Sequence, residues 1–259
     1  MEFIRPVDWD HPHVTMDGGY QGQYLYAGES CLIIATKVPP GVAGPPRHRH
    51  PSDQTYFVLQ GEITVELGEE TRAAKARSAV FIPAGLPHRN WNDGDEDEVH
   101  IEVIAPGVLP VQRLVETTEL RDTSVQPAFV QEADPAKLTG RDFALDWLAN
   151  RALGATHAAV YLAEVPPGKE GPPLHMHEFD QFYFVLQGTL SVEIGLKRYE
   201  VPPGQLVVLP AQVPHRQWNE QDETEQHLTI IVPEPMARPS EGHRWDTVVE
   251  LSVAAEQLF

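Results

Sequence analysis

The stretch that decides the fold is VPPGVAGPPRHRHPSDQTYFVLQG, residues 38–61, because it recurs as VPPGKEGPPLHMHEFDQFYFVLQG at residues 165–188. The copies are 127 residues apart (165 − 38 = 127), and 17 of the 24 aligned positions are identical. The same offset relates PAGLPHRNWN at residues 83–92 to PAQVPHRQWN at residues 210–219. The chain therefore consists of two copies of one structural unit.

Each copy has the pattern of β structure. Short runs such as residues 55–61 and 62–67 are separated by Gly, Pro, Asn and Asp, and neither copy contains a long amphipathic helix. A short helix is expected only in the connection, at residues 111–122. Evenly spaced short strands predict an all-β chain of two small barrels or jelly rolls, with domains at residues 1–127 and 128–259.

Charge and composition exclude several classes of partner. The 259 residues carry a formal net charge of −19, which repels phosphate backbones and anionic bilayers, so neither a nucleic acid nor a membrane partner is expected. No run of about 18 apolar residues is present, and residues 1–13 lack the apolar core of a signal peptide. Cys31 is the sole cysteine, so no intrachain disulfide can form, which is compatible with an expected cytoplasmic location.

Histidines are placed to converge in each copy. Side chains two residues apart on a strand face the same way, so His48 and His50 should point together. His88 follows another strand-like run and supplies a third imidazole. The counterparts in the second copy are His175, His177 and His215. One H-x-H pair is weak evidence, but recurrence of the full pattern predicts a transition-metal site in both barrels.

These stretches resemble the two sequence motifs of the cupin superfamily. The first motif is H-x-H, an acidic residue three or four positions later and then glycine, and the second is P-x-G-x-x-H-x-x-x-N. Two tandem copies resemble a bicupin over about residues 38–106 and 165–233. The resemblance implies two jelly-roll barrels, each with one divalent metal (Fe, Mn, Ni, Co or Zn), and a small-molecule substrate. It also allows a homodimer, because cupin barrels often pair through exposed sheet edges.

The resemblance also implies a ligand set, carried over position by position. That set is His48, His50, Gln54 and His88 in the first barrel, and His175, His177, Gln181 and His215 in the second. Glutamine thus stands where most relatives have glutamate. Asp53 and Asp180 directly precede the two glutamines and remain an alternative source of the fourth ligand.

Glutamine changes what such a site can do. Its amide oxygen can bind a metal but brings no negative charge, so the ion keeps its full +2 charge and becomes more electrophilic. An amide cannot act as a base near neutral pH, so proton transfer needs another group. The candidates on inward-facing positions are Tyr56, Tyr183, His100 and His227. The alternative for each is barrel filling or a structural hydrogen bond.

Three functions remain open at this level. The favoured one is a metal-dependent dioxygenase acting on a small phenolic, enolic or diketone substrate, as in quercetinase-like bicupins. The neutral fourth ligand favours instead a lyase, isomerase or cyclase in which the metal is a Lewis acid and no redox step occurs. The third is a small-molecule-binding cupin without turnover.

Overall fold

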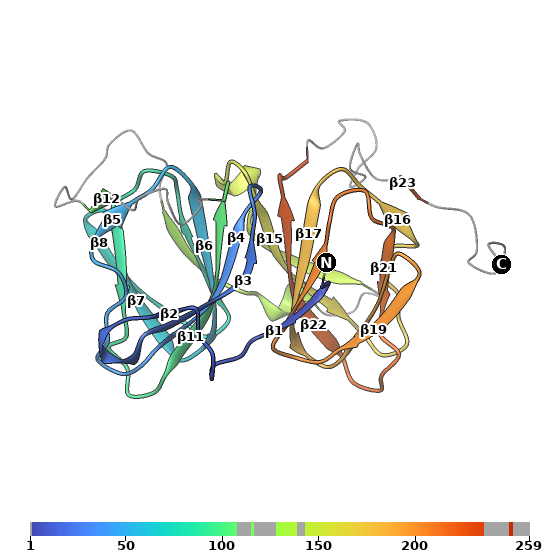
Figure 1. Cartoon of the computed structure of the whole chain (residues 1–259), viewed down its shortest axis with the longest axis horizontal. Coiled ribbons are helices and arrows are strands. Elements are labelled where there is room, and N and C mark those ends of the chain that lie inside the picture. The colour runs from blue at the N-terminus through green and yellow to red at the C-terminus, as the bar shows by residue number, and fades with distance from the viewer. Residues whose placement is uncertain (1, 108–114, 117–127, 139–142, 236–248, 251–259) are drawn as a thin grey trace. The chain divides into compact units, whose positions relative to one another are not determined.

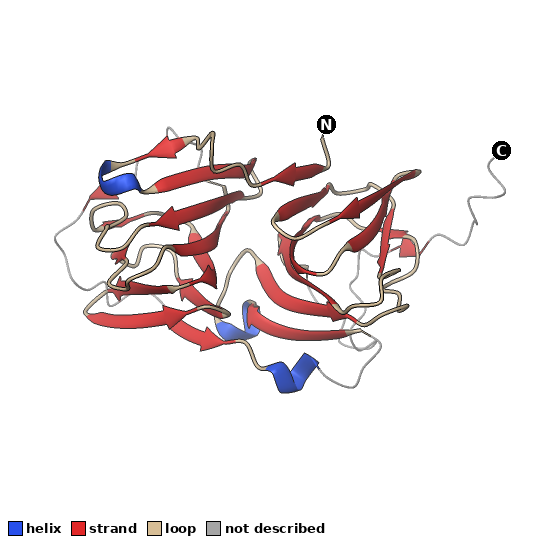
Figure 2. Ribbon diagram, turned by 90° about the horizontal axis from the view of Figure 1, so that it is seen from below, coloured by secondary structure: helices blue, strands red, loops and turns tan. Residues whose placement is uncertain are grey.

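The computed structural model describes residues 2–107, 115–116, 128–138, 143–235 and 249–250 (Figure 1). Its only helices within these ranges are three short 3-10 turns, which Figure 2 shows in blue: η1 (Asp17–Gly19), η2 (Pro135–Leu138) and η3 (Arg151–Leu153). The expected all-β class is confirmed. Across the described part of the chain, no helix has the length and apolar composition needed to span a bilayer.

The short helix expected in the connection between the two copies is not present in its described part. Residues 111–122 were expected to be helical, but residues 115–116 form strand β12 (Val115–Glu116), which pairs with β5 (His48–Arg49). Pairing with a neighbouring strand outweighs the local helix pattern, as tertiary context often does. The other residues of that stretch lie outside the described part.

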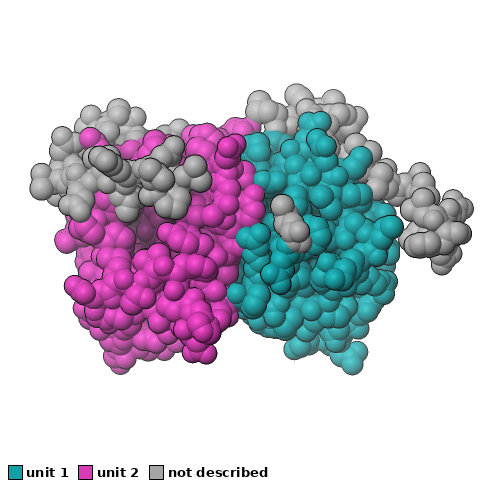
Figure 3. Space-filling view, in the orientation of Figure 1, with its two compact units in different colours: residues 1–6, 134–147, 159–259 teal, residues 7–133, 148–158 magenta. Residues whose placement is uncertain are grey.

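The chain forms two compact units, which Figure 3 shows in different colours. The N-terminal unit comprises residues 7–133 and 148–158. It contains a seven-stranded sheet in the order β13-β9-β6-β11-β4-β3-β2 and a five-stranded sheet in the order β12-β5-β10-β7-β8. The further strands of this unit are β2 (Val14–Thr15), β3 (Gln21–Ala27), β4 (Leu32–Val38), β6 (Asp53–Gln60), β7 (Glu62–Leu67), β8 (Glu70–Lys75), β9 (Ser78–Ile82), β10 (His88–Trp91), β11 (Glu98–Ala105) and β13 (Phe129–Glu132).

The C-terminal unit comprises residues 1–6, 134–147 and 159–259 and repeats this architecture. Its sheets have the orders β1-β20-β17-β22-β15-β14 and β19-β18-β21-β16-β23. The strands are β1 (Ile4–Pro6), β14 (Ala144–Ala149), β15 (Ala159–Val165), β16 (His175–Met176), β17 (Asp180–Gln187), β18 (Leu190–Ile194), β19 (Lys197–Val201), β20 (Gln205–Leu209), β21 (His215–Trp218), β22 (Glu225–Val232) and β23 (Val249–Glu250).

The domain boundary expected between residues 127 and 128 stays a prediction, because it lies at the end of a stretch outside the described residues. Two short segments nevertheless group with the opposite half of the sequence. Strand β1 pairs with β20 of the C-terminal unit, with Ile4 opposite Val207. Residues 148–158 belong to the N-terminal unit, where Thr156 hydrogen-bonds to Asp53.

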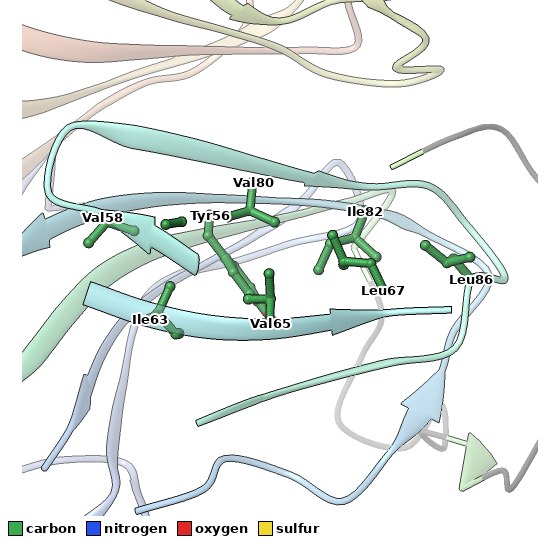
Figure 4. Packing of buried hydrophobic residues seen from close by; sticks show 9 residues of the cluster. Tyr56, Val58, Ile63, Val65, Leu67, Val80, Ile82 and Leu86 are labelled. Carbon is green, nitrogen blue, oxygen red and sulfur yellow. The ribbon is translucent and has the colours of Figure 1, made fainter. Parts of the chain in front are cut away.

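The core of the N-terminal unit lies between its two sheets. Every second residue of β7 is buried, as expected for a strand with one face inward. These side chains meet others from β6 and β9 of the facing sheet (Figure 4). The cluster includes Tyr56, Val58, Ile63, Val65, Leu67, Val80, Ile82 and Leu86. The packed interior fixes the register of the strands that carry the histidines.

A repeated asparagine secures the end of the third-histidine strand in each unit. Asn92 follows β10, and its Nδ2 donates to the carbonyl oxygens of Val38 and Glu96, at 2.8 Å each. Asn219 repeats this in the C-terminal unit. One buried amide thus satisfies two carbonyls and joins the strand carrying His88 to β4 and to the turn before β11.

We expect Asn92→Ala to lower the free energy of unfolding by about 1–3 kcal/mol, because it leaves the buried carbonyl group of Val38 without this donor. Urea unfolding followed by circular dichroism measures the change. Asp95→Ala in the same turn is the control, since Asp95 is exposed, and it should shift stability by less than about 0.5 kcal/mol. Equal effects of the two substitutions would contradict this role of Asn92.

Candidate metal centres

Antiparallel pairing brings the first three histidines together. His88 on β10 lies opposite His48 on β5, and His50 follows two residues later. One donor atom from each side chain lies within 4.8 Å of the others, and all three residues are buried. The ring centroids of His48 and His88 are 4.4 Å apart, and those of His50 and His88 are 5.0 Å apart. The sequence expectation that these imidazoles converge is met.

The second triad has the same construction. His215 on β21 lies opposite His175 on β16, and His177 completes the group. Its donor atoms also lie within 4.8 Å of one another, and the three side chains are buried. The centroids of His175 and His215 are again 4.4 Å apart. Each barrel therefore contains three histidines that could hold a metal ion.

Backbone carbonyls fix the tautomer of most of these imidazoles. His48 Nδ1 donates to Pro46 O and His88 Nδ1 donates to Leu86 O, both at 2.8 Å. A carbonyl oxygen only accepts, so Nδ1 carries the proton and Nε2 keeps its lone pair. In the second barrel the Nδ1 atoms of His175, His177 and His215 donate in the same way to Pro173, Phe179 and Val213. Neutral imidazoles oriented in this way are the usual nitrogen ligands of metals.

Burial keeps the imidazoles neutral. Desolvation holds the pKa of His88 well below its ordinary value, and the neighbouring His48 and His50 add to the effect. The same two causes, desolvation first and then the neighbouring His175, lower the pKa of His215 to about 3. At neutral pH no proton has to leave these nitrogens before a cation can bind.

The glutamine oxygen of the second barrel faces this cluster. Gln181 Oε1 lies 2.9 Å from His177 Nε2 and 3.3 Å from His215 Nε2. Because each Nε2 is unprotonated and the amide oxygen is also an acceptor, these atoms present lone pairs to one another. Two ligands at about 2.1 Å from one ion are about 3.0 Å apart at an octahedral angle and about 3.4 Å apart at a tetrahedral one, so the spacings of 2.9 and 3.3 Å fit a shared cation.

The glutamine oxygen of the first barrel faces one imidazole of its triad. Gln54 Oε1 lies 3.1 Å from His50 Nε2. His88 Nε2 is buried and has no hydrogen-bond partner among the described residues. An unpaired buried acceptor is costly, and a bound cation would satisfy it. The donor atoms of this barrel therefore also fit a divalent metal.

The aspartates beside the glutamines are engaged elsewhere. Asp53 Oδ1 accepts from Ala84 N at 2.9 Å, and its Oδ2 accepts from Thr156 N at 2.7 Å and Thr156 Oγ1 at 2.6 Å. Asp180 Oδ1 likewise accepts from Ala211 N at 3.0 Å. These carboxylates fasten backbone segments, so the geometry favours Gln54 and Gln181 as the fourth donors.

A buried carboxylate lies behind the first glutamine. Glu102 Oε2 accepts from Gln54 Nε2 at 2.6 Å, and Glu102 Oε1 accepts from Thr36 Oγ1 at 2.7 Å. His100 Nε2 lies 3.5 Å from Glu102 Oε1. Burial raises the pKa of Glu102, but the hydrogen bond and charge of His100 outweigh it, so the net pKa is lowered.

The proposed proton carriers occupy the layer behind the triads. His100 packs against Tyr56 and His227 against Tyr183, with centroids 4.6 Å apart in each pair and ring planes inclined by 43° and 53°. Their Nδ1 atoms contact Glu98 and Glu225, respectively, at 2.9 to 3.0 Å. Burial lowers the pKa of His100, yet Glu98 and Glu102 raise it to about 10. These contacts give the four residues structural partners, and their part in proton transfer stays a prediction.

The sequence patterns did not predict several residues of this layer. Glu98 and Glu225 recur at the offset of 127 (98 + 127 = 225) and precede the inward-facing histidines by two positions, so the repeat contained a usable signal. Glu102 and Thr36 have no such signal, because their counterparts are Thr229 and Ala163. Only the folded structure shows that Glu102 meets Gln54.

A family model described as "Cupin domain" matches residues 35–104 and 161–232, one match in each unit. The chain belongs to the cupin family. The two matches contain both histidine triads and both glutamines, and the jelly-roll expectation agrees with the paired sheets of each unit. This cupin chain is thus a bicupin with one candidate metal centre per barrel.

Among curated proteins, the bicupin is similar to the H2HPP isomerase of Bacillus subtilis, with 24% identity over 182 residues, 70% of each chain. Among solved structures it is similar to AerE from Microcystis aeruginosa, with a TM-score of 0.67 and 16% identity over 90% of this chain and all of that one. It is also similar to an oxalate decarboxylase from Lactobacillus farciminis, with a TM-score of 0.69 and 13% identity, covering 97% of this chain and 89% of that one. At these identities the structural likeness shows the fold.

We expect His88→Ala to lower the metal content from about two equivalents to about one, since each triad is complete in itself. His215→Ala should do the same, and the double variant should bind no transition metal. Elemental analysis of protein prepared without affinity-column metal measures the content. His157→Ala, which changes an exposed histidine, is the control. Unchanged metal content in His88→Ala would exclude the first triad as a site.

Proposed function

We propose that this bicupin is a metal-dependent enzyme that isomerises a small enolisable carbonyl compound by proton transfer, without redox. The observation that carries the proposal is the donor set. Each barrel presents three buried histidines and one amide oxygen, while the adjacent aspartates are hydrogen-bonded to backbone. In this proposal the metal ligands are the ones that the sequence analysis assigned.

Four neutral ligands leave a divalent ion with its full charge. Bound there, the metal would supply Lewis-acid chemistry, stabilising the negative charge that develops on a carbonyl oxygen during enolisation. A site built for this purpose loses effectiveness when a carboxylate ligand neutralises part of that charge. The glutamines are therefore the feature that distinguishes this proposal from a generic cupin metal site.

Apolar side chains border the first triad and favour a compact organic substrate. Leu67 lies opposite His88 in the β7–β10 pairing, and Leu86 precedes it by two residues. Ile82 is in the same buried cluster. An apolar surrounding excludes water, which strengthens electrostatic interactions at the reacting oxygen. Proton transfer is proposed for His100 and His227, together with Tyr56 and Tyr183, which pack against them.

The similarity to an H2HPP isomerase supports isomerisation ahead of the dioxygenase that the sequence analysis favoured. The dioxygenase remains the second candidate, because three histidines are also suitable ligands for Fe or Mn. It would act on a phenolic, enolic or diketone substrate and would need both a redox-active metal and oxygen. The cytoplasmic location and the homodimer stay predictions from the sequence.

One experiment distinguishes the isomerase from the dioxygenase. Apoprotein loaded with Zn²⁺ is incubated without oxygen in D₂O with a panel of 2-oxo acids, β-diketones and phenolic enols, and products are followed by ultraviolet absorbance and NMR. We expect double-bond or tautomer isomerisation with deuterium incorporation from solvent. Turnover only with a redox metal, together with stoichiometric oxygen uptake, would overturn the isomerase proposal and support the dioxygenase.

Gln181→Glu tests the importance of the neutral ligand in the second barrel. The added carboxylate should tighten Zn²⁺ binding, because it brings a negative charge to the ion, and should lower the second barrel's kcat about tenfold or more by reducing the charge available to the substrate. Competition with a chromophoric chelator and steady-state kinetics in a His88→Ala background measure both. Gln187→Glu, on the exposed end of the same strand, is the control. An unchanged affinity and rate would mean that Gln181 does not touch the ion.

A further inference from the structure

The layer behind the two candidate metal centres is only partly conserved between the copies. His100, Glu98 and Tyr56 recur as His227, Glu225 and Tyr183. At the same offset, however, Glu102 is replaced by Thr229 (102 + 127 = 229), and Thr36 is replaced by Ala163. All four of these side chains are buried, with exposed fractions of 0 to 7%. The two sites therefore differ in the groups that contact the back of the glutamine.

In the first barrel the glutamine amide is hydrogen-bonded to a carboxylate. Gln54 Nε2 donates to Glu102 Oε2 at 2.6 Å, and hydrogen bonds to an ionised carboxylate are shorter and stronger than those between neutral groups. Glu102 Oε1 accepts from Thr36 Oγ1 at 2.7 Å, so both carboxylate oxygens act as acceptors, as the ionised form requires. With its nitrogen held there, the amide presents Oε1 to His50 Nε2.

In the second barrel the equivalent amide, that of Gln181, contacts neutral groups. Gln181 contacts the buried hydroxyl of Tyr161, a position occupied by Ile34 in the first barrel. Its Oε1 still faces His177 and His215. Glu102 is therefore not needed to orient a glutamine in this fold. What it adds to the first site is an ionised hydrogen-bond acceptor on the far side of the amide.

We propose that Glu102 acts through Gln54 as a positioning residue that makes the N-terminal site bind divalent metal more tightly than the C-terminal site. A carboxylate that accepts a hydrogen bond from the far side of a ligand raises the basicity of that ligand. Here it draws the N–H dipole of Gln54 and increases the electron density on Oε1. Loss of such an outer partner typically costs about 10- to 100-fold in metal affinity. The inference rests on the proposed metal ligation, and assigns the two sites different affinities.

Single-site proteins test the inference. His215→Ala retains only the N-terminal site and His88→Ala only the C-terminal site, and apoprotein of each is titrated with Zn²⁺ against a chromophoric chelator. We expect the N-terminal site to have a Kd about 10- to 100-fold lower. Adding Glu102→Gln to the His215→Ala protein should raise its Kd toward that of the C-terminal site. The same substitution in the His88→Ala protein is the matched control and should change nothing.

Two further measurements separate this role from a merely structural one. The Mn²⁺ EPR spectrum should change on Glu102→Gln in the His215→Ala protein and remain constant in the His88→Ala protein. The melting temperature of the apoprotein identifies any general loss of stability, and Glu102→Thr, which copies the residue of the second barrel, provides a second variant if Glu102→Gln misfolds. Folded variants with an unchanged Kd and spectrum would overturn the inference.

The possible failures are distinguishable. Equal Kd values for the two single-site proteins, with no effect of Glu102→Gln, would overturn this inference but leave the proposed metal-dependent function standing. Absence of metal from both single-site proteins would overturn the proposed ligation and this inference together. A tighter C-terminal site would also overturn this inference, because the neutral surroundings of Gln181 would then favour the ion more than Glu102 does.

Discussion

The antiparallel pairing of one histidine with another is the constraint on which both sites depend. His48 faces His88 across β5 and β10, and His175 faces His215 across β16 and β21. A shift of one residue in either pairing would send the imidazoles to opposite faces of the sheet. The buried interior of each unit opposes such a shift, because it would also expose the alternating apolar side chains. The strand register that buries the apolar core is thus the same register that brings the histidines together.

Backbone carbonyls convert this pairing into a set of ligands. The Nδ1 protons of His48 and His88 are held by carbonyls two residues earlier in the chain, so Nε2 carries the lone pair. Desolvation then disfavours protonation of that nitrogen, as the lowered pKa values of His88 and His215 show. The fold therefore prepares neutral donors in advance. A cation that enters has no proton to displace and little side-chain motion to restrain.

Duplication preserved this inner arrangement while the surroundings diverged. The triads, glutamines and His–Glu pairs recur in both units, whereas Glu102 and Thr36 are replaced by Thr229 and Ala163 at the equivalent positions. A change behind a ligand alters the charge felt by the ion without disturbing the ligand itself. Two barrels with nearly identical triads can in this way bind metal ions with different affinities within one chain.

Much of this protein could be predicted from its sequence, because the repeat doubles every signal. The offset of 127 residues separates recurring positions from incidental ones, and strand alternation places His48 and His50 on one face. The all-β class, the two units and the convergence of the triads follow from these local patterns. The hydrogen bonding of Asp53, which favours Gln54 as the proposed ligand, did not follow from them, because its partner Thr156 is 103 residues away in the sequence. The hydrogen bond between Glu102 and Gln54, which joins β11 to β6, could not be predicted either, because Glu102 does not recur in the second copy. Periodicity determines which face a side chain takes, whereas its partner on that face is decided only when distant strands are brought into register.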